Sequence, residues 1–464
     1  MIKKIRRKIN QRLKDKDLSE IVKKSASGFF ISILGRNFGF AQQLVITNFY
    51  GAAAFGVFRV CFSILSLVGI FGRFGVDMAI SRFVAQYRKQ DRMDLVNEIF
   101  QIGLKMVFPL AVALTAGIYF LAPWLSEKFY NDPNGEVPDF TPYIQIFSIG
   151  IIFFVLSGVI EEGIRGLKKI KEYTWINNVS TQAFSIIILL LAFTFTTNMY
   201  IVNVSYVLGL IFTFILGVYY WLKFVPYKKV EEPELSRKEL LKVSLPMLSA
   251  KYLTTLYTWL GTLILAAYVA PDEVGVFNAA ARMSAFATMP LIAVNNISGP
   301  RFAEAYGESD ERSLRKTVRL STRLIFWTAM PIMLLFYLFP EQILGIYGKE
   351  FKTSDAILTF AVINAGQVIN FMTGPVTQLL NMTGRQLVTQ RYAIITTFTS
   401  IGLSLLLIPT MGMLGAALAT AVARTVLNLG CALHIYFTMK IVTIYNPITD
   451  LYGVLQRYRN KRSQ

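Results

Sequence analysis

The sequence has few of the residues that build metal centres, disulfide frameworks or catalytic sites. Its 464 residues include two cysteines and one histidine, and only 16% of them are charged. Cys61 and Cys431 each stand alone in an apolar stretch, without the paired spacing of a zinc site. No GxxxxGK phosphate loop occurs, so we expect no ATP hydrolysis by this chain. We therefore expect a protein that is not an enzyme and that carries no metal and no cofactor.

Acidic residues are also scarce. The chain holds 28 acidic residues against 47 basic ones, which gives a formal net charge of +19. The chain is 54% hydrophobic, and its charged fraction is far lower than that of a soluble basic protein. Its mean hydropathy of +0.48 also lies above the globular range. This composition excludes a nucleic-acid-binding globule.

Long apolar stretches fill most of the chain. A helix of about 20 apolar residues crosses the roughly 30 Å hydrocarbon layer of a bilayer. Twelve stretches of the sequence meet this requirement. They are residues 28–50, 57–80, 102–125, 143–163, 175–196, 200–222, 240–266, 274–297, 321–339, 356–380, 392–409 and 413–439. The sequence therefore predicts an all-α polytopic membrane protein with twelve transmembrane helices.

Basic residues gather in every second connection between these stretches. Lys168 and Lys169 follow the fourth stretch, and Arg312, Arg315 and Lys316 follow the eighth. The intervening connections hold only Lys128, Lys349 and Lys352 as basic residues, beside several acidic ones. Because basic loops stay in the cytoplasm, we expect both termini to be cytoplasmic and the protein to cross the cell membrane many times.

A short motif pair recurs in the two halves of the chain. Residues 56–58 (GVF) return as 275–277, and residues 82–87 (RFVAQY) return as 301–306 (RFAEAY), each 219 positions later. Both copies begin and end a span in the same orientation, which indicates two six-helix lobes related by a pseudo-two-fold axis along the membrane normal. The predicted domains are a basic amphipathic N-terminal segment (1–27), an N-lobe (28–222), a cytoplasmic linker (223–239), a C-lobe (240–439) and a basic cytoplasmic tail (440–464).

Four further motifs, in this order and spacing, carry a family resemblance. They are NFYGAAAFGVF at 48–58, GVDMAISRF at 75–83, LNMTGR at 380–385 and IPTMGMLGAALAT at 408–420. With them the chain resembles the polysaccharide transporters and O-antigen flippases of the multidrug/oligosaccharidyl-lipid/polysaccharide exporter (MOP) superfamily. That superfamily also includes the lipid II flippase and the MATE multidrug transporters.

The resemblance implies a flippase. Its substrate would be a polyprenyl-diphosphate-linked sugar, moved from the inner to the outer leaflet by alternating access. It further implies a monomeric transporter surrounded by membrane lipids, working with sugar transferases and a polymerase, with no nucleic-acid partner.

Cations inside the predicted spans support this interpretation independently. Each one costs roughly 2.5 to 3.5 kcal/mol at the bilayer centre, so they should face water or a ligand. Guanidinium groups match phosphate oxygens in paired hydrogen bonds. We therefore predict a cationic cavity that binds a diphosphate headgroup. Its candidate residues are Arg36, Lys251, Arg282 and Arg424.

Each candidate also has a structural alternative. Arg424 could make hydrogen bonds between the lobes, and Arg282 could extend toward the membrane surface. Arg73 lies four residues before Asp77 on one helix, so the two form either an internal ion pair or part of a gate.

Three other functions remain open from the sequence. A MATE-like cation-coupled multidrug exporter would need buried acids, and this chain has the opposite surplus. A membrane-embedded sugar transferase or ligase would need acidic metal-binding pairs or a large catalytic loop. A passive scramblase is not separable from a coupled flippase at this level.

Overall fold

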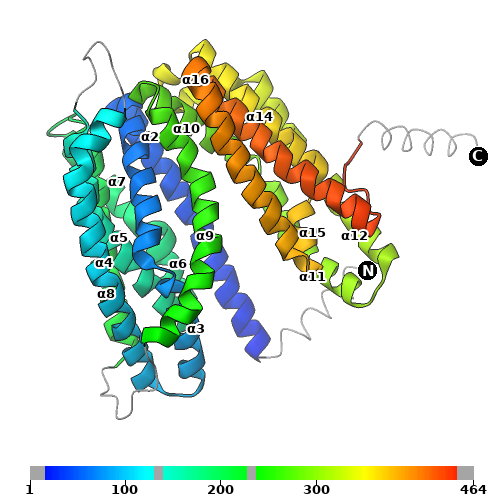
Figure 1. The fold of residues 1–464 in the computed structure, drawn as a ribbon, viewed down its shortest axis with the longest axis horizontal. Helices are drawn as coiled ribbons and strands as arrows, with labels where there is room; N and C mark the ends of the chain where they lie inside the picture. The colour runs from blue at the N-terminus through cyan, green and yellow to red at the C-terminus, as the bar shows by residue number, and fades with distance from the viewer. Residues whose placement is uncertain (1–15, 130–138, 227–236, 447–464) are drawn as a thin grey trace, which may run out of the picture. The chain divides into compact units, whose positions relative to one another are not determined.

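The computed structural model describes residues 16–129, 139–226 and 237–446, and within these ranges the chain is helical with no strand (Figure 1). Two stretches of 3-10 helix and one of π-helix interrupt the α-helices. The helices are α2 (Lys16–Arg73), α3 (Val76–Lys89), α4 (Met93–Lys128), α5 (Thr141–Gly166), α6 (Ile170–Trp175), η1 (Ile176–Ser180), α7 (Thr181–Phe193), α8 (Tyr200–Phe224), α9 (Arg237–Ala266), α10 (Pro271–Phe286), α11 (Met289–Gly307), α12 (Glu311–Leu338), α13 (Pro340–Leu344), η2 (Gly345–Tyr347), η3 (Lys349–Phe351), α14 (Ser354–Thr373), α15 (Val376–Met382) and α16 (Gln386–Met439).

Eight helices in the described ranges are long and apolar enough to cross a membrane, or nine if the bent pair α10 and α11 counts as one span. The protein is therefore a multi-pass membrane protein. Two of the eight are kinked by a glycine in a non-helical conformation. Gly51 (φ 88°, ψ 171°) divides α2, and Gly412 (φ 53°, ψ −132°) divides α16. Both kinks lie in gaps between predicted spans.

The helices pack into two compact units. Unit 1 comprises Met1–Thr255 with Ala270–Asp272, and unit 2 comprises Leu256–Val269 with Glu273–Gln464. The change of unit falls inside α9. Most of the predicted 223–239 linker lies outside the described residues, as do residues 1–15 of the N-terminal segment and 447–464 of the tail. The predicted lobe boundaries stay a prediction.

In unit 1, α5 is the central helix and packs against α2, α3, α4 and α8. Glycines on α5 allow this close packing, because a Cβ on Gly166 would lie 2.7 Å from the Ser81 carbonyl oxygen. Phe147 of α5 and Tyr206 of α8 stack with ring centroids 5.6 Å apart. Aromatic stacking and close approach at the α5 glycines thus hold the helices of unit 1 around α5.

In unit 2, α14 packs against both α12 and α16. Gly366 of α14 faces the backbone of α16, since a Cβ at this position would lie 2.9 Å from the Ala421 Cα atom. After α16 ends at Met439, residues 440–446 continue in a non-helical conformation beside α12 and α14. The Tyr445 amide donates to the Met372 carbonyl at 2.8 Å, and Trp327 Nε1 donates to the Tyr445 hydroxyl at 2.8 Å. These bonds tie the segment to α14 and α12.

The turns after α3 in unit 1 and after α11 in unit 2 have the same hydrogen-bond pattern. After α3, the Arg92 amide donates to the Tyr87 carbonyl at 3.0 Å. After α11, the Asp310 amide donates to the Ala305 carbonyl at 2.9 Å, 218 positions later. Asp91 and Ser309, the residues before these amides, both adopt positive φ (59° and 55°). The offset of 218 is one residue less than that of the sequence repeat, and the same turn also ends α5 and α15, so it is a shared C-cap geometry.

Gly374, which separates α14 from α15, offers a test of the packing in unit 2. Its backbone (φ 74°, ψ −150°) is nearly restricted to glycine, and an added Cβ would lie 2.8 Å from Thr322 Cβ. Gly374→Ala should therefore lower the unfolding free energy by about 2 to 5 kcal/mol, from strain and overpacking together. Gly384 has the same φ of 74° but open space around it, so Gly384→Ala should cost only about 1 to 2 kcal/mol. Thermal unfolding of both purified variants measures the difference, and equal midpoints would contradict the proposed clash.

Candidate functional site

The structure places Arg73 and Asp77 side by side in unit 1. Arg73 Nη1 lies 3.9 Å from Asp77 Oδ2, and the two side chains are 13% and 1% exposed. Arg73 Nη2 also donates to the Phe154 carbonyl at 2.8 Å, and the guanidinium lies 4.4 Å from the centre of the Phe154 ring. Gly158 leaves the space that the guanidinium occupies. Arg73 is thus neutralised within unit 1 and does not add to a cationic surplus.

Two predicted site residues have side chains outside the described part of the structure. Arg36 lies on α2 and Lys251 on α9. Gly35, next to Arg36, lies close to η1. A Cβ added to Gly35 would lie 2.6 Å from Asn178 Cβ. The cavity roles of Arg36 and Lys251 stay predictions.

Arg424 lies near the middle of the second half of α16. It follows the Gly412 kink by twelve residues and precedes the helix end at Met439 by fifteen, which is about 18 Å and 22 Å along the axis. The side chain is half-buried. Within the described ranges its guanidinium makes no ion pair and no hydrogen bond. The Arg424 carbonyl accepts a bond from Asn428 Nδ2 at 2.9 Å.

Arg282 is half-buried on α10, and α14 sets its depth relative to Arg424. Two residues after Arg282, Ser284 Oγ donates to Asn364 Oδ1 of α14 at 2.6 Å. Two residues after Asn364, Gly366 contacts Ala421, which precedes Arg424 by three residues. With the two contacts taken as level, these helical steps place the two arginine Cα atoms within roughly 11 Å in depth, or about two helical turns.

A polar layer on α14 lies at the same level, and the sequence did not single it out. Asn364, Gln367 and Thr359 are all at most 2% exposed. Asn370 Nδ2 donates to Gln367 Oε1 at 3.3 Å. Among the described residues, Asn364 Nδ2 and Thr359 Oγ1 have no hydrogen-bond partner. Such groups favour a polar ligand or water nearby, since an unpaired buried amide costs about 1 to 3 kcal/mol.

Carboxylates near the ends of the spans have partners of their own. Asn177 Nδ2 donates to Glu161 Oε2 at 2.8 Å, and Arg165 Nη1 lies 3.0 Å from Glu162 Oε2. Within the described residues, no group of three histidine, cysteine or acidic side chains is placed to hold a metal ion. Because the side chains of Arg36 and Lys251 lie outside the described part, Arg424 and Arg282 are the two predicted cavity residues whose side chains the structure describes.

Comparison with protein families gives two matches. The family described as "Polysaccharide biosynthesis protein" matches residues 21–306, and the MatE family matches residues 246–407. Among solved structures, an inward-facing MATE transporter of the MOP superfamily aligns with a TM-score of 0.74 at 14% identity, covering 89% of this chain and 98% of that one. The lipid II flippase MurJ in an inward closed conformation aligns with a TM-score of 0.70 at 15% identity, covering 92% of this chain and 89% of that one.

Curated relatives match over part or most of the chain. The probable low-salt glycan biosynthesis flippase Agl15 of Haloferax volcanii is 24% identical over 193 residues, which are 40% of this chain and 39% of that protein. The alignment thus spans about two fifths of that relative's length. Stage V sporulation protein B of Bacillus subtilis is 21% identical over 459 residues, covering 89% of this chain and 83% of that protein. The first family match covers more than half of the sequence, and the chain therefore belongs to the polysaccharide biosynthesis protein family.

Proposed function

We propose that this protein is a flippase that moves a polyprenyl-diphosphate-linked oligosaccharide from the cytoplasmic to the outer leaflet. The observation that carries the proposal is Arg424, a half-buried guanidinium near the middle of an apolar helix with no ion pair among the described residues. A charge in that position needs water or an anion. The relative described as a probable glycan biosynthesis flippase supports the same activity.

The chemistry of the side chains favours a diphosphate as the anion. A guanidinium presents parallel N–H donors that fit two phosphate oxygens, and its charge persists at any physiological pH. Arg282 and Arg424 lie roughly two helical turns apart in depth, so we propose that arginines from two helices contact one extended headgroup. Arg36 and Lys251 complete the proposed set.

We propose twelve spans in two six-helix lobes that work by alternating access. The kinks at Gly51 and Gly412 support this number, because each divides one long helix into two segments. The sequence motifs that return 219 positions later support the internal repeat. By the positive-inside rule, both termini lie in the cytoplasm and the protein resides in the cell membrane. The carrier lipid's tail would stay in the bilayer while its headgroup crosses the membrane through the protein.

No covalent bond changes in this reaction, so the driving force must come from outside the chain. Two negative charges that move outward across 100 mV, negative inside, gain about 4 to 5 kcal/mol. The membrane potential would therefore favour export of the diphosphate. Cationic groups that cross the field in the empty protein would favour the return step.

A cation-coupled multidrug exporter is the second candidate, and the MatE match over residues 246–407 favours it. That function requires carboxylates that are free to bind protons, sodium ions or cationic drugs. In the described part of the protein, Asp77 pairs with Arg73 and Glu162 pairs with Arg165. The charge balance thus favours an anionic cargo.

Reconstituted vesicles test the proposal directly. The purified chain should move a lipid-linked oligosaccharide diphosphate across the bilayer, and a potential that is negative on the headgroup's starting side should raise the rate. The control is a cationic dye offered to the same vesicles, which should not move faster than in protein-free vesicles. Dye export without headgroup movement would favour the multidrug exporter. Headgroup movement that ignores both voltage and ion gradients would refute the coupling but not the substrate.

A further inference from the structure

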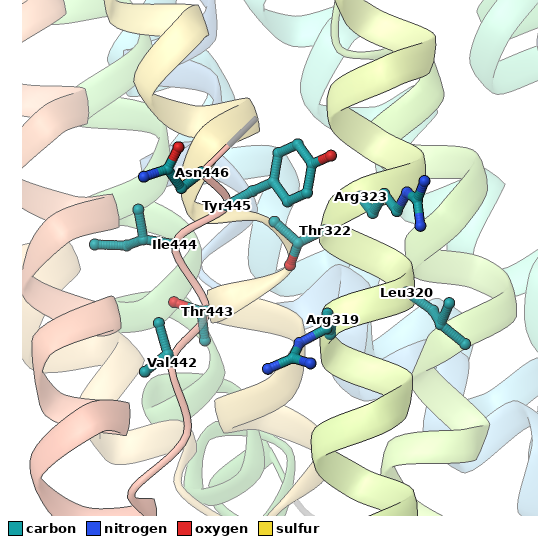
Figure 2. A pocket seen from close by; sticks show the side chains of 9 residues that line it. All are labelled: Arg319, Leu320, Thr322, Arg323, Val442, Thr443, Ile444, Tyr445 and Asn446. Carbon is teal, nitrogen blue, oxygen red and sulfur yellow. The ribbon is translucent and has the colours of Figure 1, made fainter. Parts of the chain in front are cut away.

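A basic groove lies in unit 2 between α12 and the non-helical segment 440–446. It consists of two adjoining hollows of about 430 Å³ and 370 Å³ that share Arg319, Leu320 and Val442 in their walls (Figure 2). Figure 2 shows the Arg319 side chain extending from α12 toward this segment. Neither hollow includes a residue that we assign to the transport cavity.

The groove carries a strong positive charge. Cations recur on α12 at intervals of three and four residues, which places them along one face of the helix. They are Arg312, Arg315, Lys316, Arg319 and Arg323, and Lys440 adds a sixth from the end of α16.

Few acids offset this charge. Arg315 lies 3.3 Å from Glu311 and also donates to the Lys440 carbonyl at 2.6 Å, so it fastens the segment to α12. Among the described residues, Arg312, Lys316 and Arg319 form no ion pair. Like charges at this spacing destabilise a helix, and a bound anion would relieve that repulsion.

Residues 440–446 form an ordered wall of the groove. Its buried and exposed residues alternate, with Ile441, Thr443 and Tyr445 buried and Val442 and Ile444 exposed. Thr443 lines the groove, is 4% exposed, and has a hydroxyl with no hydrogen-bond partner among the described residues.

Exposed apolar side chains continue from the basic groove along α12. Leu320, Leu324 and Trp327 are 55%, 51% and 43% exposed, and they follow one another at helical spacing. Val442 is 64% exposed on the opposite wall. Cations beside exposed leucines and a tryptophan are typical of the boundary between lipid headgroups and acyl chains.

We propose that the basic groove binds the phosphate headgroup of an anionic membrane lipid. Lys316 and Arg319 contact the phosphate, and the acyl chains lie along Leu320 and Leu324. The lipid is a resident of the protein's surface and not the transported cargo, so this proposal is independent of the flippase assignment. Bound there, it would hold segment 440–446 against α12.

Native mass spectrometry of the purified full-length chain tests this site, because it resolves individual bound lipids. We expect phosphatidylglycerol to bind, and Lys316→Gln/Arg319→Gln to weaken this binding by roughly thirtyfold, as the loss of two surface cations predicts. The matched control is Arg82→Gln/Lys89→Gln on α3, which also removes one exposed arginine and one exposed lysine. This control should bind as wild type does. The charge-retaining variant Lys316→Arg/Arg319→Lys should keep most of the affinity.

Several outcomes would overturn the proposal. Equal weakening by the α3 control would mean general attraction to anionic lipid without a site. Equal affinity for zwitterionic phosphatidylcholine would remove the role of net charge. Binding of inorganic phosphate alone, at an affinity equal to that of the lipid, would assign the groove to a free anion. If Lys316→Gln/Arg319→Gln fails to fold, Arg312→Gln, in the same wall, should still weaken binding by about fivefold.

Discussion

Arg424→Ala should lower the rate of headgroup translocation by roughly ten- to a hundredfold while leaving the protein folded. A hydrogen bond to a charged group contributes about 1.5 to 3 kcal/mol, and alanine removes the donor without filling the polar site. Arg282→Ala and Arg36→Ala should act in the same direction. Arg424→Lys should retain part of the activity, because an ammonium keeps the charge but loses the paired geometry.

The control for this series lies on the same helix. Arg391 of α16 is exposed, and Arg391→Ala removes an equal charge outside the proposed cavity. Its transport rate and abundance should match those of the wild type. Full transport by Arg36→Ala, Arg282→Ala and Arg424→Ala, each at normal abundance, would remove the phosphate-binding assignment.

The second large effect concerns stability. Arg73→Gln should lower the unfolding free energy by about 3 to 5 kcal/mol, because it leaves the Asp77 carboxylate 1% exposed without its cation. The Phe154 carbonyl also loses its 2.8 Å hydrogen bond. Asp77→Asn should cost less, since Arg73 keeps its contacts with Phe154. Thermal unfolding in detergent gives the order of the midpoints.

A double variant separates the ion pair from the rest of the packing. Arg73→Met/Asp77→Leu replaces both charges with apolar side chains, and such replacements of buried pairs are often neutral. We expect its loss to be smaller than that of Arg73→Gln alone, whereas Arg82→Gln on the exposed face of α3 should change little. A loss in the double variant equal to the summed losses of Arg73→Met and Asp77→Leu made singly would show that the charges are not coupled.

Much of the helical order could be predicted from the sequence, because a lipid-crossing helix must be long and apolar. The gap predicted between residues 50 and 57 contains the kink at Gly51, and the gap between 409 and 413 contains Gly412. Breaks within an apolar stretch were missed. The predicted span 356–380 is interrupted at Gly374, and the predicted span 175–196 begins with a π-helical turn, Ile176–Ser180. Hydropathy does not register such local changes, since the residues around them stay apolar.

The candidate site was predictable where it depends on local spacing. Arg73 and Asp77 stand four residues apart, and their pairing was expected on one continuous helix. In the structure the pair forms across a break, because Phe74 and Gly75 adopt positive φ between α2 and α3. The α14 polar layer around Asn364 gave no local signal, because an asparagine in a membrane helix becomes informative only when its neighbours are known. The basic groove was missed for a similar reason. Arg315 and Lys440 meet across 125 positions of sequence, through a return of the chain that periodicity does not reveal.

The central claim is that arginines in the spans bind a diphosphate, and a paired-ligand binding measurement tests it most directly. The purified chain would be titrated with a polyprenyl diphosphate and with the polyprenol of equal length, which differs only in the headgroup. We predict a preference of about a hundredfold or more for the diphosphate in the wild type. We predict near-equal binding of the two lipids by Arg282→Ala/Arg424→Ala. Equal affinities in the wild type, or an unchanged preference in the double variant, would contradict the account.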